Sequence, residues 1–159
     1  IELAQENPDQ YFVGADIHLT SLEIGARAAA DALLDNIRFI KADCGLLVPY
    51  IPDSSSNAAA VMFPAPVPKN DGSFKGIPTP EFSDQVHRTL SGTGDPLEFA
   101  SDSEPYFNHR MRQIGARGLY SLAPDEFTIG FGNSANPTRY QMLWERKNIP
   151  THHAILRKA

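Results

Sequence analysis

The sequence lacks the features that mark several special classes of protein. Its 159 residues contain one cysteine, Cys44, so no disulfide can form within them, which favours a reducing compartment such as the cytoplasm. No apolar run approaches the roughly 20 residues needed to span a membrane. No basic segment followed by an apolar stretch marks a secretory signal at the start. With a hydrophobic content of 42%, the sequence predicts one compact domain over residues 1–159 and no membrane association.

Positive charge is also in short supply. The 14 lysines and arginines against 19 aspartates and glutamates give a net charge of -5, the wrong sign for a whole surface that attracts nucleic acid. The segment from residue 137 to the end is an exception, because Glu145 alone opposes a set of cations: Arg139, Arg146, Lys147, Arg157 and Lys158. A local basic end can hold phosphates. The alternative is a solvated pair of C-terminal strands.

Several motifs that carry chemistry are missing. No phosphate-binding loop, zinc motif or Ser-His-Asp order is present. His152 and His153 are adjacent, so in a strand they face opposite sides and are poor candidates for one metal. Cys44 has no neighbouring histidine pattern and is interpreted as a buried structural thiol. We therefore expect no metal site.

Apolar, β-rich segments alternate with segments of helical periodicity, which predicts an α/β fold with a doubly wound, mostly parallel, Rossmann-like sheet. A capping box at Thr20 and Glu23 and a Thr79-Pro80 cap are the expected helix starts, followed by Ser103. Residues 69–78 are expected to form a mobile loop. The expected strong strands are 11–17, 37–43, 58–63 and 96–102, and the possible later ones are 126–131, 139–144 and 153–156.

Acidic residues end or follow three of the four strong strands: Asp16, Asp43 and Asp102. Ligands of such sheets bind beyond the carboxyl ends of the strands. A carboxylate has two oxygens, so Asp16 is suited to accept both hydroxyls of a ribose. Asp43 is suited to accept from an adenine amino group, with Cys44 packed near the ring. The alternatives are a helix cap for Asp16 and a turn for Asp43.

The segment FPAPVPK, from Phe63 to Lys69, is the most distinctive in the sequence. Its alternating prolines fix the backbone in an extended form and present Lys69 beyond the end of a strand. Such rigidity favours a role beside a ligand cleft. The alternative is a stiff connection to the next helix.

Several of these segments occur in an order and spacing that is typical of one known family. YFVGADI, NIRFIKAD, FPAPVPK, Ala100-Ser101-Asp102 and Thr138-Arg139-Tyr140-Gln141 together resemble the tRNA (guanine-N7) methyltransferases, from about Ile1 to Arg157. The resemblance implies the class I S-adenosylmethionine-dependent methyltransferase fold, with tRNA as partner. It implies S-adenosylmethionine binding by Asp16, Ile17, Asp43, Cys44 and Phe63. It implies substrate binding by Lys69, Asp102, Thr138, Arg139 and Gln141.

The sequence departs from the family at positions that the family uses for catalysis or for holding the guanine. Ala65 stands at the family's Asp of F-P-D-P, so no catalytic residue is assigned, and Val67 replaces a tryptophan. Gln141 replaces a glutamate, and the basic run after Lys69 is thinned. An inactive relative that binds cofactor or RNA is therefore a second hypothesis. A third is an unrelated α/β protein that binds another small ligand.

The sequence begins at Ile1 in what reads as the last turns of a helix before Asn7-Pro8. The family's glycine-rich loop, which holds the methionine part of the cofactor, is not found after Ile1. Its strand is expected between the strands that end at Asp16 and at Phe63. The resemblance thus predicts a divergent member that lacks this strand and loop and extends upstream of Ile1.

Overall fold

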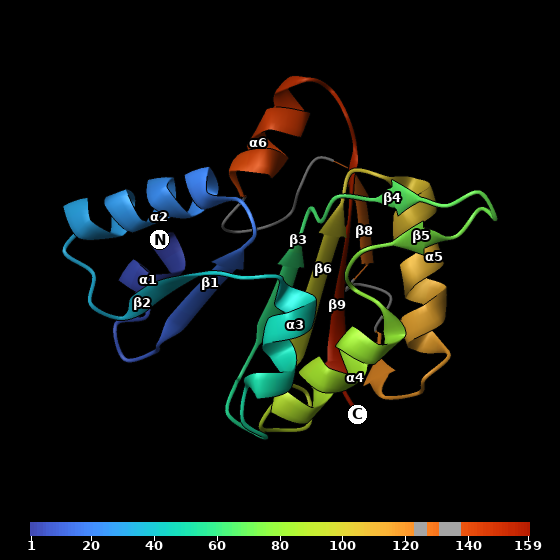
Figure 1. Cartoon of the computed structure of the whole chain (residues 1–159), viewed down its shortest axis with the longest axis horizontal. Coiled ribbons are helices and arrows are strands. Elements are labelled where there is room, and N and C mark those ends of the chain that lie inside the picture. The colour runs from blue at the N-terminus through green and yellow to red at the C-terminus, as the bar shows by residue number, and fades with distance from the viewer. Residues whose placement is uncertain (123–126, 131–137) are drawn as a thin grey trace. The chain divides into compact units, whose positions relative to one another are not determined.

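The structure is a computed structural model that describes residues 1–122, 127–130 and 138–159. It divides into two compact units (Figure 1). Unit 1 is Ile1–Leu47 and unit 2 is Val48–Ala159. Each unit is described separately below.

Unit 1 is built around two parallel strands. β1 (Phe12–Asp16) pairs with β2 (Ile37–Lys41), and Phe12 lies opposite Ile37. The connection runs through α2 (Leu19–Asp31), which packs against both strands. This is the β-helix-β arrangement expected from the sequence, because parallel neighbours require a crossover that a helix can supply. The short helices α1 (Glu2–Glu6) and α3 (Cys44–Leu47) complete the unit.

A single buried amide holds the beginning of unit 1 together. The Nδ2 atom of Asn36 lies 2.9 Å from the carbonyl oxygen of Ala4, 3.1 Å from that of Asn7 and 3.0 Å from that of Gln10. Asn36 is itself buried, and its carbonyl accepts the N–H of Phe12. The segment from α1 to β1 is therefore fixed by a side chain that lies directly before β2 and donates to three of its carbonyls.

The expected capping box at Thr20 and Glu23 is wrong. α2 begins at Leu19 with His18 as its N-cap, and no side chain caps it. The Oδ1 atom of Asp16 accepts the N–H of His18 at 2.8 Å, so the chain turns into the helix directly after the strand. Thr20 and Glu23 consequently lie inside the first turns rather than at the cap.

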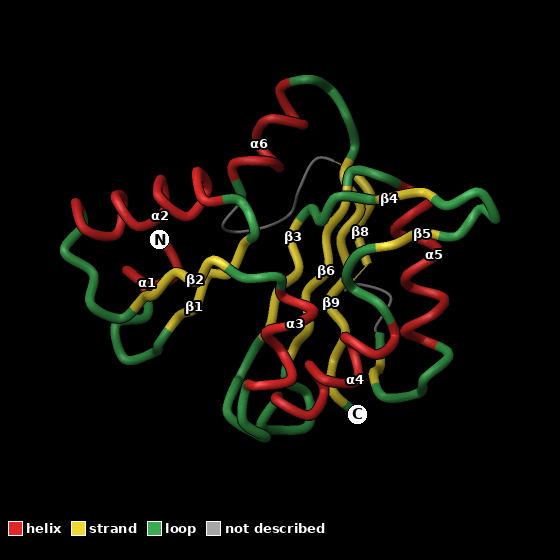
Figure 2. The backbone as a smooth tube through the Cα atoms, in the orientation of Figure 1, coloured by secondary structure: helices red, strands yellow, loops and turns green. Residues whose placement is uncertain are grey.

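Unit 2 contains a five-stranded mixed sheet (Figure 2). β3 (Ala59–Met62) and β6 (Pro96–Ser101) are parallel, with Val61 opposite Phe99. β9 (Thr151–Lys158) runs antiparallel to β6, and β7 (Tyr120–Ser121) and β8 (Phe127–Gly130) are antiparallel to β9. Strands joined by helical crossovers are parallel in both units, and the C-terminal strands add the antiparallel edge. The predicted α/β class is confirmed, with β7, β8 and β9 as an antiparallel part of the sheet. Of the expected strand 126–131, Glu126 and Phe131 lie outside the described residues.

Helices α4 (Pro80–Thr89) and α5 (Glu104–Gly115) pack on each other, and α5 also packs on β6 and β9. The predicted cap of α4 is confirmed, because the hydroxyl oxygen of Thr79 accepts the N–H of Phe82 at 3.1 Å. The core between α5 and the sheet is aromatic: the rings of Phe99 and Phe107 stack with centroids 5.0 Å apart. A 3₁₀ turn, η1 (Val48–Tyr50), precedes the first strand of the unit.

Two local predictions differ from the structure of unit 2. The possible strand 139–144 is wrong: these residues lie in helix α6 (Arg139–Arg146), which the hydroxyl of Thr138 caps by accepting the N–H of Gln141. The cap satisfies a free backbone N–H of the first helical turn, and the aromatic and apolar residues of the segment give no sign of this cap in the sequence. The expected loop 69–78 contains part of a hairpin, in which β4 (Val67–Pro68) pairs with β5 (Phe74–Lys75).

β1 in unit 1 and β3 in unit 2 are both edge strands among the described residues. Among the described residues, β1 pairs only with β2, and β3 only with β6. The strand and glycine-rich loop expected upstream of Ile1 stay a prediction. Within the described ranges, none of the helices combines the length and apolar character that a membrane crossing requires.

Candidate functional site

The predicted cofactor residues of unit 1 lie together at the carboxyl ends of β1 and β2. We call Asp16, Ile17, Asp43 and Cys44 the strand-end cluster. The backbone brings them together, because the N–H of Ala42 donates to the carbonyl of Asp16 at 3.0 Å just past the last strand pair. Each aspartate accepts one N–H two residues later, Asp16 from His18 and Asp43 from Gly45, both at 2.8 Å. Both carboxylates are thereby oriented while keeping acceptor capacity for a ligand.

Cys44 lies inside this cluster. Its Sγ atom is 3.6 Å from the carbonyl oxygen of Ala15. Burial raises the pKa of the Cys44 thiol above its ordinary value, and the nearby charges of Asp43 and then Asp16 raise it further. The thiol therefore stays protonated and is a poor nucleophile at neutral pH, but Cys44 is half-buried rather than buried as expected from the sequence.

The cluster has the composition of a nucleoside site. It offers two carboxylates as acceptors for hydroxyl or amino groups. It also offers an apolar side chain, Ile17, that is 58% exposed. Neither a cation nor a strong nucleophile belongs to it. These residues fit the adenosine part of S-adenosylmethionine by the chemistry of their donors and acceptors.

Phe63 and the predicted substrate residues belong to unit 2. Phe63 follows β3 in the left-handed conformation, with φ of 52°, which is strained for an aromatic residue. Its N–H donates to the carbonyl of Ala100 at 2.9 Å, so the ends of β3 and β6 are held side by side. Asp102, half-buried, comes directly after β6. The structure thus brings Phe63 and Asp102 to adjacent strand ends.

The ring of Phe63 faces an aromatic side chain of α6. The centroids of Phe63 and Tyr140 are 6.3 Å apart with an interplanar angle of 26°. Tyr140 is exposed over more than half of its surface. Tyr140 is therefore accessible from solvent and is not part of the core.

Lys69 lies at the start of the hairpin turn. Its N–H donates to the carbonyl of Ser73 at 2.8 Å, and its carbonyl accepts the N–H of Gly72. The turn is tightened by Asp71, whose carboxylate accepts the hydroxyl of Ser73 at 2.6 Å and its N–H at 3.0 Å. These bonds lower the pKa of the Asp71 carboxyl. The Lys69 side chain is exposed, so it is available to a ligand at a turn of defined shape.

Ala65 is exposed and lies against the return limb of the same hairpin. A Cβ built on Gly76, whose φ is 92°, would come within 3.2 Å of the carbonyl oxygen of Ala65. Because the Ala65 side chain reaches solvent, an aspartate fits at this position without displacing core atoms. The structure therefore imposes no steric requirement for a residue as small as Ala65 at this position.

The three predicted residues around α6 differ in accessibility. Thr138 is the N-cap of the helix, and its hydroxyl oxygen accepts the N–H of Gln141 at 3.1 Å. Gln141 is buried, with its Nε2 atom 3.5 Å from an oxygen of Glu145. Arg139 is the first residue of the helix, and its side chain lies outside the described part of the structure. A buried Gln141 offers little of its amide to a ligand in this conformation.

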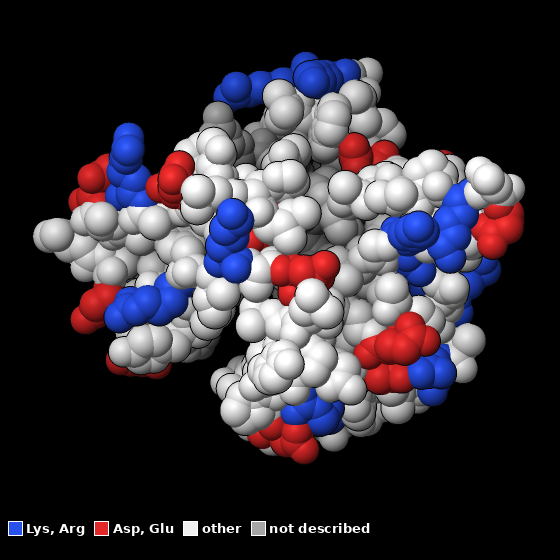
Figure 3. All heavy atoms as spheres, viewed as in Figure 1, with Lys and Arg blue, Asp and Glu red and all other residues white. Residues whose placement is uncertain are grey.

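Positive charge in unit 2 gathers at two places (Figure 3). One is the end of α6, where Arg146 and Lys147 are exposed, and Lys147 Nζ lies 4.8 Å above the ring of Trp144. The other is the β4–β5 hairpin, where Lys69 and Lys75 are exposed. The basic end predicted from the sequence is therefore in part a helix with an aromatic neighbour rather than a strand pair.

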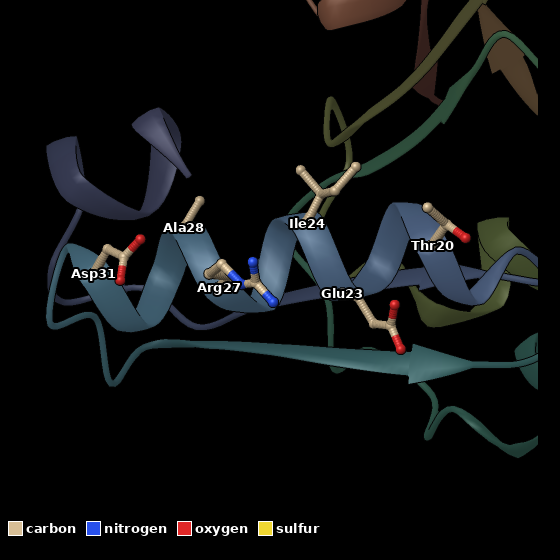
Figure 4. A pocket seen from close by; sticks show the side chains of 6 residues that line it. All are labelled: Thr20, Glu23, Ile24, Arg27, Ala28 and Asp31. Carbon is tan, nitrogen blue, oxygen red and sulfur yellow. The ribbon is translucent and has the colours of Figure 1, made fainter.

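A shallow hollow runs along the exposed side of α2 (Figure 4). All of its lining residues come from that helix: Thr20, Glu23, Ile24, Arg27, Ala28 and Asp31. The alternation of Glu23, Arg27 and Asp31 at intervals of four residues is typical of a solvated helix face. In the described ranges, no group of three or more His, Cys, Asp and Glu side chains is arranged to hold a metal ion.

Sequence reasoning missed Tyr106 and Arg110 on α5. Both are buried, and both donate hydrogen bonds to the backbone of the hairpin that carries Lys69. Their separation of four residues places them on one helix face, which is a visible signal for a cation–aromatic pair. Their partners, about 30 residues away in the sequence, leave no local signal.

Comparison with known proteins gives a consistent result. Residues 1–154 match the protein family described as "Putative methyltransferase". A tRNA (guanine-N(7)-)-methyltransferase from Rubrobacter xylanophilus is 32% identical over 91% of this chain and 65% of its own length. One from Chloroherpeton thalassium is 31% identical over 98% of this chain and 69% of its own length. The chain thus spans about two thirds of the length of these relatives.

Solved structures with low sequence identity share the fold. The tRNA (m1A58) methyltransferase TrmI from Aquifex aeolicus has a TM-score of 0.57 at 12% identity, over 94% of this chain and 53% of that one. A methyltransferase-like protein from Streptococcus mutans, solved in complex with SAH, has a TM-score of 0.52 at 13% identity, over 94% and 76% of the two chains. At this level of identity the likeness concerns the fold alone.

Proposed function

Since this chain belongs to the tRNA (guanine-N7) methyltransferase family, we propose that the full-length protein transfers a methyl group from S-adenosylmethionine to N7 of a guanine in tRNA. The observation that carries the proposal is the strand-end cluster, which sets two oriented carboxylates beside an exposed apolar side chain. That combination is suited to a nucleoside rather than to a metal or an acyl group. The proposal includes a cytoplasmic location, which the single cysteine supports.

In the proposed function, unit 1 binds the cofactor. Asp16 accepts the ribose hydroxyls, Asp43 accepts from the adenine amino group, and Ile17 and Cys44 pack near the ring. The sulfonium of S-adenosylmethionine supplies the electrophilic methyl group. Guanine N7 has an in-plane lone pair, so the protein needs to position the base more than to remove a proton.

In unit 2, the proposed substrate residues are Lys69, Asp102, Thr138, Arg139 and Gln141, and the proposed cofactor residue is Phe63. Lys69 is exposed on a defined turn and is suited to a phosphate or to the edge of a base. Asp102 stands at the end of β6 beside Phe63 and is suited to accept from guanine N–H groups. The burial of Gln141 requires a local change in α6 before its amide reaches a base.

A second candidate function is a family member that binds cofactor or tRNA without efficient transfer. Two observations favour it: Ala65 is exposed where the family has a carboxylate, and Gln141 is buried. Ala65→Asp in the full-length protein separates the two functions, since the exposed position accepts the larger side chain. An inert wild type with an active variant supports the second function, whereas equal activity in both removes its main argument.

The first test is calorimetric titration of S-adenosylhomocysteine into the full-length protein. We expect saturable binding that Asp16→Asn weakens about tenfold to a hundredfold, because the amide removes the charge that accepts the ribose hydroxyls. Asp31→Asn is the matched control, since it removes the same charge from an exposed position of the same unit. Absence of binding by the folded wild type contradicts the proposed function.

A further inference from the structure

Arg110 on α5 is unusually buried for an arginine, because only 2% of the residue is exposed. None of the carboxylates in the described part of the structure forms an ion pair with it. A buried guanidinium is costly unless hydrogen bonds replace its water. The hydrogen bonds that replace water around the Arg110 guanidinium indicate the role of this residue.

The guanidinium binds the backbone of the β4–β5 hairpin. Its Nη2 atom donates to the carbonyl oxygens of Phe74 at 2.9 Å and of Gly76 at 2.7 Å. Its Nη1 atom donates to the side chain of Gln113 at 2.7 Å, which orients the group from the next turn of α5. Its centre lies 5.2 Å from the centroid of the Tyr106 ring, a favourable site for a cation.

Tyr106 binds the same segment. Its hydroxyl donates to the carbonyl oxygen of Ile77, and its ring meets that of Phe74 edge-on at 5.2 Å. Phe74 also packs against the ring of His109 at 5.5 Å. The carbonyls of Phe74, Gly76 and Ile77 are thus all held by α5, and Gly76 can take the left-handed φ that this requires.

Holding β5 fixes β4, because Val67 pairs with Lys75 and Pro68 with Phe74. Lys69 follows β4 directly, so its position depends on β5 through this pairing. The prolines stiffen the segment from Phe63 but contribute no N–H groups to anchor it. The anchor comes from α5 instead.

We propose that Arg110 is a positioning residue that clamps the β4–β5 hairpin, so that Lys69 meets its substrate in a fixed place. The hydrogen bonds of the clamp belong to the fold and do not depend on the proposed function. The effect of the clamp on tRNA rests on the proposed function. A planar group with several N–H donors can bind two carbonyls from one side, whereas a lysine ammonium is a point charge with a different geometry.

The test measures hydrogen exchange by mass spectrometry in the full-length protein, together with the KM and kcat for tRNA. In Arg110→Met we expect the peptide covering residues 67–77 to exchange at least about tenfold faster, while peptides from β6 and β9 are unchanged. We expect KM for tRNA to rise about tenfold with a smaller change in kcat. Arg110→Lys should lie between the wild type and Arg110→Met. Arg112→Met, an exposed position on the same helix, is the matched control and should change neither the exchange nor KM.

Unchanged exchange in residues 67–77 overturns the clamp, as does faster exchange spread equally over all peptides of Arg110→Lys. If Arg110→Met does not fold, Arg110→Lys decides by the same criterion. If the wild type binds no cofactor and methylates no tRNA, the proposed function fails. The exchange of the hairpin still decides whether the clamp exists.

Discussion

The two units bury their apolar side chains to very different extents. In unit 2, the side chains of Phe99, Tyr106 and Phe107 are fully buried and contact one another. In unit 1, the buried apolar side chains are small in number, whereas Tyr11 is 79% and Val13 is 64% exposed. Unit 2 therefore has a buried aromatic core, whereas unit 1 has few buried apolar side chains beside the hydrogen bonds of its paired strands and of Asn36.

The difference concerns how each unit positions its functional residues. The hairpin of Lys69 is supported by packed rings and by the buried cation of Arg110, so a change in the core is expected to shift the hairpin. Asp16 and Asp43 are oriented by backbone N–H groups within two residues of themselves. The strand-end cluster should consequently depend less on remote packing than the hairpin does.

The largest expected effect comes from Phe107→Ala. The ring is fully buried against Phe99 and 5.6 Å from the ring of His152, so its removal leaves a cavity. We expect the free energy of unfolding to fall by about 3–5 kcal/mol, measured by urea denaturation. Tyr11→Ala, which truncates an exposed ring of unit 1, should change it by no more than about 0.5 kcal/mol. Similar losses in both variants would contradict the contrast between the units.

A smaller effect is expected from Asn36→Ala. The substitution leaves the carbonyls of Ala4, Asn7 and Gln10 without their common donor. We expect a loss of about 1–3 kcal/mol in the free energy of unfolding, with faster hydrogen exchange confined to residues 4–12. Asn7→Ala is the control, because that amide donates to one exposed carbonyl, that of Leu3. Equal losses from the two variants would show that the buried amide does not hold the unit.

The smallest effect distinguishes two helix starts. Thr79→Ala removes the hydroxyl that accepts the N–H of Phe82, and we expect a loss of about 1 kcal/mol. Thr20→Ala, inside the first turn of α2, should be neutral or slightly stabilising, because alanine has the higher helix propensity. Thermal unfolding of both variants measures the difference. A loss at Thr20 as large as that at Thr79 would restore the capping box expected from the sequence.

The sequence predicted the parts of the fold that rest on local pattern. The strands ending at Asp16 and at Asp102 and the helix capped by Thr79 were located within about two residues of their observed bounds. Apolar runs bounded by turn residues and a threonine before a proline are strong local signals. The family motifs likewise indicated the fold class, and family membership excludes the hypothesis of an unrelated α/β protein.

Other features were predicted wrongly or missed for physical reasons. Tyr140 and Trp144 favour a strand, but the other four residues of segment 139–144 are good helix formers, and the segment is a helix that Thr138 caps. The thinned basic loop read as a mobile segment because a two-residue strand pair gives too short a pattern. Arg110 was missed because its backbone partners, the carbonyls of Phe74 and Gly76, lie more than 30 residues away in the sequence.

The sequence by itself determined which residues form strand ends, where carboxylates follow them and which family the motifs belong to. These features depend on the chemistry of neighbouring residues, and neighbours are visible in a sequence. Only the tertiary structure decided that Gln141 is buried, that Asn36 joins three carbonyls and that Arg110 holds the hairpin. Each of these depends on groups that meet in space, because a buried polar group takes whichever partner the fold brings within hydrogen-bonding distance.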